Sequence, residues 1–269
     1  MSRQRPASVA LAALLVALAA CTSTTTTAPP VPPPSPALAE TKEAQGLRAR
    51  AAYERGLVFL REGQPGAALA SLQEATRLDP TAALYANTMG VVLLQQFRQL
   101  AGALAWLERA TLLDPQYGDA QLNYAVALAE AALWDRAIEG YRKALALPTL
   151  TVPHVAHQNL GLALYHLKRY PEAEESIRFA LSLEPQMVGA HYNLGLVLLA
   201  LGKKDDAVAA FRKEQEMAPR SSDFHKAAGQ RLKDLGQGGG LKPGFCLPDE
   251  EFRVKNFMFW SRPAGVGVG

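Results

Sequence analysis

A motif that recurs about every 34 residues fills the middle of this chain and constrains its fold more than any other feature. Four segments carry two alanines around a large apolar residue and end in proline: Ala68-Leu72-Ala75-Pro80, Ala103-Leu107-Ala110-Pro115, Ala137-Tyr141-Ala144-Pro148 and Ala173-Ile177-Ala180-Pro185. A fifth segment is Ala207-Phe211-Pro219, and the successive prolines lie 35, 33, 37 and 34 residues apart. This period predicts an all-α solenoid of helix pairs. Such solenoids present extended binding surfaces, so the pattern favours binding over catalysis.

Each of these segments follows a second helical pattern with a small residue near its middle. The small residues are Gly56, Gly90, Ala125, Gly161 and Gly195. A small residue lets two helices approach closely, and proline ends the second helix because it cannot continue the backbone bonding. Glu214 stands where the fifth unit should have its second alanine, as expected where a stack ends. The pattern predicts five helix pairs within residues 41–220.

Two segments follow the predicted repeats. Residues 221–236 form an amphipathic pattern, and we expect a capping helix that shields the last apolar face of the stack. Residues 237–269 carry three glycines at 238–240, followed by Phe252, Phe257, Phe259 and Trp260 with little periodicity. The sequence leaves open whether this tail is disordered or folds back onto the repeats. It also leaves open the role of Cys246.

The N-terminus has the features of a bacterial lipoprotein precursor. Residues 1–20 read as a signal peptide, with Arg3 and Arg5 before an apolar run that ends in small residues. Leu18-Ala19-Ala20-Cys21 resembles a lipobox, which implies cleavage before Cys21 and lipidation of its thiol. An ordinary cleaved signal and an uncleaved membrane anchor are the alternatives. Several acyl chains on Cys21 would provide stable membrane anchoring.

The residues after Cys21 indicate how far from the membrane the repeats begin. The segment 21–40 is rich in Thr and Pro, which favours an extended, semi-rigid linker. Residue 22 is Thr and not Asp, and by the sorting rule for lipoproteins of two-membrane bacteria this implies a periplasm-facing position at the outer membrane. The net charge of +3 is too balanced to indicate nucleic-acid binding.

No motif for catalysis or for cofactor binding stands out in the sequence. We find no HExxH, glycine-rich phosphate loop, CxxC or GxSxG pattern, so we expect no enzyme activity, cofactor or small-molecule substrate. His154 and His157 share a helix face, and His191 repeats the position of His157. A metal site would need a third supported ligand, so these histidines are read as helix-surface residues and no metal is expected.

The repeat resembles the tetratricopeptide pattern: Leu-Gly, an apolar or aromatic residue, Ala, Phe or Tyr, Ala and Pro. In that family the first helices line a concave surface, and asparagines there bind the backbone of an extended ligand. An amide can donate and accept together, which suits a peptide group. The candidate partner-binding residues are therefore Asn123, Asn159, Asn193, Leu162, Tyr165 and Leu196. Asn87 lies one position off this register, and asparagine before Leu-Gly is also simply common in the repeat.

The lipobox, linker and repeats together resemble the pilotin lipoproteins of type IV pilus biogenesis, of the PilF, PilW and Tgl type. The resemblance rests on Asn123-Tyr124 and on the insertion 148–153 before Asn159-Leu160-Gly161. It implies an outer-membrane scaffold that helps a secretin subunit to assemble. The alternative is a general cell-envelope adaptor lipoprotein, for example for cell-wall hydrolases or export machinery. An enzyme or a metal-binding protein is a third alternative.

Overall fold

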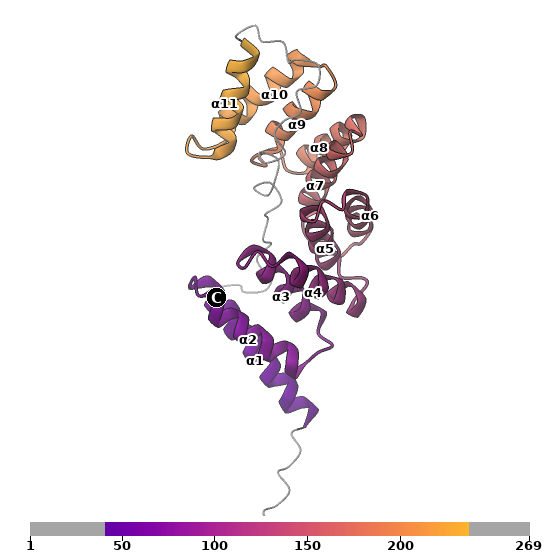
Figure 1. Cartoon of the computed structure of the whole chain (residues 1–269), viewed down its shortest axis with the longest axis vertical. Helices are drawn as coiled ribbons and strands as arrows, with labels where there is room; N and C mark the ends of the chain where they lie inside the picture. Colours follow the sequence, from indigo (N-terminus) through magenta and orange to yellow (C-terminus); the bar gives the residue numbers. More distant parts are fainter. Residues whose placement is uncertain (1–40, 237–269) are drawn as a thin grey trace, which may run out of the picture. The chain divides into compact units, whose positions relative to one another are not determined.

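The computed structural model describes residues 41–236, which form eleven helices and no strand (Figure 1). The first helices of the five pairs are α1 (Lys42–Arg61), α3 (Ala83–Gln95), α5 (Gly118–Glu130), α7 (Pro153–His166) and α9 (Ala190–Ala200). The second helices are α2 (Pro65–Leu78), α4 (Leu100–Leu113), α6 (Trp134–Leu145), α8 (Tyr170–Leu183) and α10 (Lys204–Met217), and α11 (Asp223–Gly236) follows them. The predicted all-α stack of about five helix pairs with a terminal helix is confirmed.

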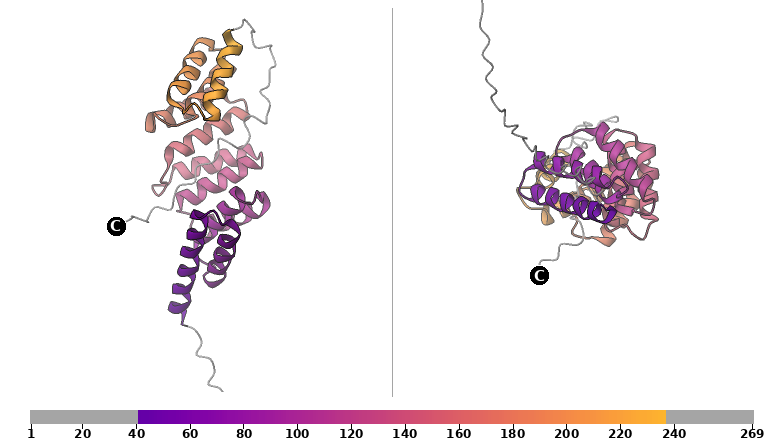
Figure 2. Two further views of the ribbon diagram at one scale, coloured as in Figure 1. Left: turned by 90° about the vertical axis from the view of Figure 1, so that its left-hand side faces the viewer. Right: turned by 90° about the horizontal axis from the view of Figure 1, so that it is seen from below.

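The helices pack against their neighbours in chain order (Figures 1 and 2). The first helices of adjacent pairs also touch, α3 with α5, α5 with α7, and α7 with α9. Helix α11 packs against α10 and α9 and adds Ala228 and Leu235 to the apolar core. Each pair therefore buries its apolar surface against adjacent pairs, which is the arrangement that defines a solenoid.

Small residues face large ones where the two helices of a pair meet. Four such contacts join Gly56 to Leu72, Gly90 to Leu107, Gly161 to Ile177 and Gly195 to Phe211. In the third pair Ala125 replaces the glycine, and the second helix supplies Gly140 opposite it, where an added Cβ would lie 2.8 Å from the Cβ of Ala125. The spaced alanines of the second helices, such as Ala68 and Ala103, are fully buried. The close helix approach that the sequence predicts is thus present in each pair.

The turn within each pair places one residue in the left-handed region. These residues are Gly63, Arg98, Ala132, Lys168 and Gly202, with φ between 55° and 75°. Glycine adopts this conformation without strain, whereas the other three side chains carry a cost of about 1–2 kcal/mol each. The turn geometry therefore repeats along the stack although no residue type marks it in the sequence.

An acidic residue before proline ends several of the second helices. The carboxylate of Asp79 accepts hydrogen bonds from the backbone N–H and the hydroxyl of Thr81, at 3.0 and 2.7 Å. Asp114 accepts a similar bond of 2.9 Å from the N–H of Gln116. A short acidic side chain bonded to the backbone two residues later stabilises a turn, and the proline that follows prevents the helix from continuing.

The insertion after α6 packs against the first turn of α5. The backbone N–H of Gly118 donates a 3.0 Å hydrogen bond to the Thr149 hydroxyl, and the N–H of Thr151 donates a 2.9 Å bond to the carboxylate of Asp119. A Cβ at position 118 would lie only 2.6 Å from the backbone nitrogen of Leu150, so glycine is needed there. The insertion therefore lengthens the connection between pairs three and four while remaining attached to pair three.

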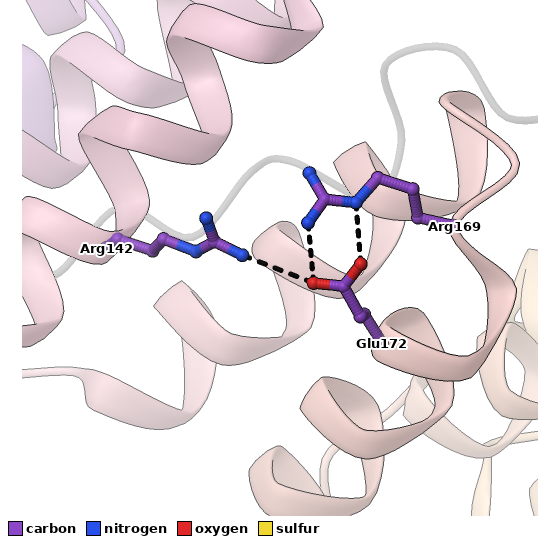
Figure 3. A network of polar contacts seen from close by, with 3 residues as sticks. All are labelled: Arg142, Arg169 and Glu172. Carbon is purple, nitrogen blue, oxygen red and sulfur yellow. Dashed lines mark hydrogen bonds and ion pairs between the residues drawn. The ribbon is translucent and has the colours of Figure 1, made fainter.

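Ion pairs join consecutive second helices on the outer surface. Glu172 in the first turn of α8 accepts hydrogen bonds of 2.7 and 2.6 Å from Arg169 and one of 3.3 Å from Arg142 of α6 (Figure 3). The hydrogen bond from Arg169 lowers the pKa of Glu172. Lys203, just before α10, forms a 2.7 Å ion pair with Glu174 of α8, which joins the second helices of pairs four and five. The ion pairs of Glu172 are partly exposed and screened by water, whereas the side chain of Glu174 is only 14% exposed.

Several sequence predictions fall outside residues 41–236. The signal peptide, Cys21 and the linker precede the described range, and the tail with Cys246 follows it. Among the helices that the structure describes, none is long and apolar enough to cross a membrane.

Candidate partner-binding site

A row of asparagines follows the first helices of four consecutive pairs. Asn87 lies on α3, Asn123 on α5, Asn159 on α7 and Asn193 on α9. The amide nitrogen of Asn123 donates a 2.9 Å hydrogen bond to the amide oxygen of Asn87. The one-residue offset of Asn87 in the sequence therefore does not remove it from the row.

The row continues from Asn87 to a tyrosine that sequence reasoning missed. The amide nitrogen of Asn87 donates a long, 3.5 Å hydrogen bond to the hydroxyl of Tyr117, which precedes α5. Burial raises the pKa of Tyr117 to about 12, so the hydroxyl keeps its proton at neutral pH. No regular spacing connects Tyr117 to the asparagines, so the repeat pattern carries no signal for this contact.

A small pocket lies where α3, α5 and α7 come together, and two of the predicted residues share it. Its volume is about 20 Å³, and its lining is Val91, Leu94, Gln95, Leu107, Leu122, Asn123, Val126, Val155 and Asn159. A space of this size holds a water molecule. An apolar lining with a few convergent amides is typical of a site that orients one polar group of a ligand.

Asn159 is the least satisfied polar group of this pocket. Its side chain is 1% exposed, and neither its amide nitrogen nor its amide oxygen has a hydrogen-bond partner among residues 41–236. Leaving a buried donor or acceptor unpaired costs about 1–3 kcal/mol. A peptide group or a water molecule supplies both a donor and an acceptor, so either would satisfy Asn159. Because the pocket has room for about one water molecule, the arrangement suits a water or a single polar atom of a ligand beside Asn159.

The other predicted residues lie in different surroundings. Asn193 is fully buried on α9, and Leu162 and Leu196 are buried in the apolar core. Tyr165 is half-buried and packs against the ring of Tyr170 with a centroid distance of 5.4 Å. The structure thus brings Asn123 and Asn159 together in the pocket and gives Leu162 and Leu196 packing roles. Contact of these two leucines and Tyr165 with a partner stays a prediction.

The histidines of α7 and α9 do not form a cluster with other metal-ligating groups. His157 packs on Phe179 of α8 at a centroid distance of 4.4 Å, and burial lowers its pKa. Burial also lowers the pKa of His191. Within residues 41–236 no three His, Cys, Asp or Glu side chains are placed together to hold a metal ion.

A protein-family model and solved structures both resemble this stack of helix pairs. The tetratricopeptide repeat family model matches residues 36–83 and 159–222. The matched segments are tetratricopeptide repeats and contain the first pair and most of the last two, so the resemblance predicted from the sequence is confirmed for these repeats. A search of curated proteins finds no match to this sequence.

Solved structures with the same fold include two pilus proteins. PilW, described as a widely conserved type IV pilus biogenesis factor, is 21% identical with a TM-score of 0.66, over 71% of this chain and 87% of PilW. PilF of Pseudomonas aeruginosa is 20% identical with a TM-score of 0.59, over 72% of this chain and 94% of PilF. MamA from Desulfovibrio magneticus is 22% identical with a TM-score of 0.58, over 65% of this chain and 97% of MamA. Likeness at this identity shows the fold.

Proposed function

We propose that this protein is a non-enzymatic scaffold that binds an extended segment of a partner protein along its first helices. The observation that supports this most directly is the buried amide of Asn159, which has no partner among the described residues and shares an apolar pocket with Asn123. A main-chain peptide group of the partner would bond to Asn159, and apolar burial around it would supply affinity. Tetratricopeptide solenoids serve as interaction scaffolds, in keeping with this role.

We further propose that Cys21 is lipidated and holds the scaffold at the outer membrane, facing the periplasm. The lipobox before Cys21 and the Thr at position 22 support this proposal from the sequence. The proposed partner is the secretin subunit of a type IV pilus, which the scaffold would help to assemble. Support for this partner comes from the fold shared with PilW and PilF and from the insertion before Asn159.

A general cell-envelope adaptor is the second candidate function. MamA shares the fold with a TM-score of 0.58, against 0.66 for PilW and 0.59 for PilF, and at 20–22% identity the shared fold does not identify the partner. The binding site would be the same in either case. The identity of the captured protein distinguishes the two candidates.

Affinity capture from solubilised envelopes tests the proposal. The lipidated wild-type chain and the Asn159→Ala variant are used as baits, and captured proteins are identified by mass spectrometry. We expect a secretin as the leading protein on the wild type and its loss on the variant. Capture of cell-wall enzymes or export components would support the adaptor instead. Equal capture by both baits would show that Asn159 does not contribute to partner binding.

Membrane fractionation tests the anchor separately. The Cys21→Ala variant should leave the membrane fraction, whereas the wild type should remain there and carry acyl chains detectable by mass spectrometry. Continued membrane association of the variant would show that lipid on Cys21 is not the anchor.

A further inference from the structure

Helix α1 differs from the other first helices of the stack in its charge. Five of its residues are basic and two are acidic. The basic residues, all exposed, are Lys42, Arg48, Arg50, Arg55 and Arg61. The helices α3, α5, α7 and α9 contain no lysine or arginine. Among the first helices, basic residues are therefore confined to the one that begins the described stack (Figure 1).

The side of α1 that faces away from the stack carries an apolar stripe. At 3.6 residues per turn, Leu47, Ala51 and Val58 lie within about 40° of one another around the helix axis. The side chains of Leu47 and Val58 are 64% and 38% exposed. The buried residues Ala49 and Gly56 lie on the opposite side of the helix. Helix α1 therefore has two apolar sides, and folding of the stack covers only one of them.

Arginines border this stripe along both edges. The same periodicity places two arginines on each edge, Arg50 with Arg61 and Arg48 with Arg55. Arg50 forms a 2.8 Å ion pair with Glu54, and Arg55 pairs with Glu74 of α2. These two arginine side chains are still 74% and 48% exposed. We call the stripe and its four arginines the outer face of α1.

We propose that the outer face of α1 binds the surface of a bilayer that contains anionic phospholipids. A helix with an apolar stripe and basic borders lies in the plane of such a surface, with its apolar side chains at the boundary between headgroups and acyl chains. The guanidinium groups bond to lipid phosphates, which they match in charge and geometry. This inference goes beyond the proposed function, since α1 contributes no residue to the α3–α5–α7 pocket.

The position of α1 in the chain favours a lipid surface as the occupant of this face. Nineteen residues separate Cys21 from Thr41, and a chain of that length reaches at most about 65 Å. The proposed lipid on Cys21 would thus keep α1 close to the bilayer and raise its effective concentration there. The contact of α1 alone is weak and is lost when membranes are washed, so it orients the stack and does not replace the anchor.

Vesicle sedimentation tests the inference on the mature chain with Cys21→Ala, which carries no lipid. We expect binding to vesicles of phosphatidylglycerol and phosphatidylcholine, and none to phosphatidylcholine alone. Leu47→Glu should weaken this binding about tenfold, because it replaces an inserted leucine by a charge that the lipid repels. Leu112→Glu is the matched control, since it makes the same change at a leucine of α4 that is 75% exposed, and it should bind as the unsubstituted chain does.

Charge reversal tests the contribution of the arginines. Each basic residue near an anionic surface strengthens binding about fivefold, so Arg61→Glu should weaken it by about tenfold or more. Lys233→Glu changes the net charge equally at an exposed position of α11 and should leave binding unchanged. High salt should abolish the binding of the unsubstituted chain, because it screens exposed charges. Circular dichroism checks that all variants are folded.

Three results would overturn the inference. These are equal binding of Leu47→Glu and the unsubstituted chain, no binding to anionic vesicles, and equal binding to anionic and neutral vesicles. A concentration-dependent dimer that Leu47→Glu abolishes would assign the outer face of α1 to a second copy and would contradict the lipid contact. If the vesicle assay fails while Cys21→Ala still releases the chain from membranes, the proposed anchor stands and only the role of α1 is lost.

Discussion

Glu214 of α10 accepts a 2.7 Å hydrogen bond from the backbone N–H of Gly189, the N-cap residue immediately before α9. The same carboxylate accepts a 3.3 Å bond from the N–H of Tyr192. The first N–H groups of a helix have no partner within the helix. Glu214 therefore caps α9 from the neighbouring helix, and it does so as a fully buried side chain. The substitution of the repeat's alanine by glutamate thus joins α9 to α10.

We expect Glu214→Ala to destabilise the protein although alanine is the regular residue of the repeat at this position. The variant leaves the N–H groups of Gly189 and Tyr192 buried without their acceptor, at a cost of about 1–3 kcal/mol. Urea unfolding followed by circular dichroism measures the loss. The matched control is Glu216→Ala, whose side chain is 70% exposed and whose removal should change stability by less than about 0.5 kcal/mol. Equal effects of both variants would contradict the capping role.

The ionisation of Glu214 should make part of the stability depend on pH. Burial raises its pKa above the ordinary value of 4.5, although backbone hydrogen bonds oppose the shift. The folded protein then keeps a proton that the unfolded chain has already lost. The stabilisation from this group is complete below the unfolded pKa and is lost as the pH rises through the folded pKa.

Glu214→Gln isolates this titration, because glutamine keeps an acceptor and cannot ionise. The unfolding free energy of the wild type relative to this variant should fall as the pH rises from about 4 to about 7. A constant difference across this range would show that the pKa of Glu214 is not raised. Glu216→Gln provides the exposed control.

The period and the apolar offsets were sufficient to predict the helix pairs and their close contacts. Gly195 was predicted as a contact residue because small and large residues at fixed offsets must meet when two helices pack. The sequence did not predict that Gly140 supplies the small residue opposite Ala125 in the third pair. That contact depends on which side of each helix faces the other. The left-handed residues Ala132 and Lys168 were missed because only glycine signals that conformation in a sequence.

The candidate site was predictable only in part. Asn123 and Asn159 were found because the repeat places them at equal positions on successive first helices. The hydrogen bond between Asn123 and Asn87 was missed, because the offset of Asn87 by one residue suggested a different helix face. Glu214 was interpreted as a sign that the stack ends, and sequence alone cannot show that its carboxylate reaches the start of α9. Long-range side-chain contacts depend on distances that a local pattern does not contain.

Gly195→Ala should destabilise the fifth pair by about 1–3 kcal/mol, because overpacking forces side chains or backbone to move. The new Cβ would lie 2.6 Å from Cε1 of Phe211, which is fully buried. Gly46→Ala is the control, since it lies in α1 with no atom within 4 Å of the new Cβ. There alanine should stabilise the helix by about 0.5–1 kcal/mol. Thermal unfolding of both variants measures the contrast, and a loss of stability at position 46 would contradict this account.

The two asparagines of the pocket should respond differently to alanine, which separates binding from folding. Asn159 has no hydrogen-bond partner among residues 41–236, so Asn159→Ala should leave the unfolding free energy unchanged or raise it by about 1 kcal/mol. Asn123→Ala removes the bond to the amide oxygen of Asn87 and should lower stability by about 1 kcal/mol. Both variants should lose partner binding in the envelope capture. Reduced stability of Asn159→Ala with unchanged capture would show that Asn159 supports the fold and does not contact a ligand.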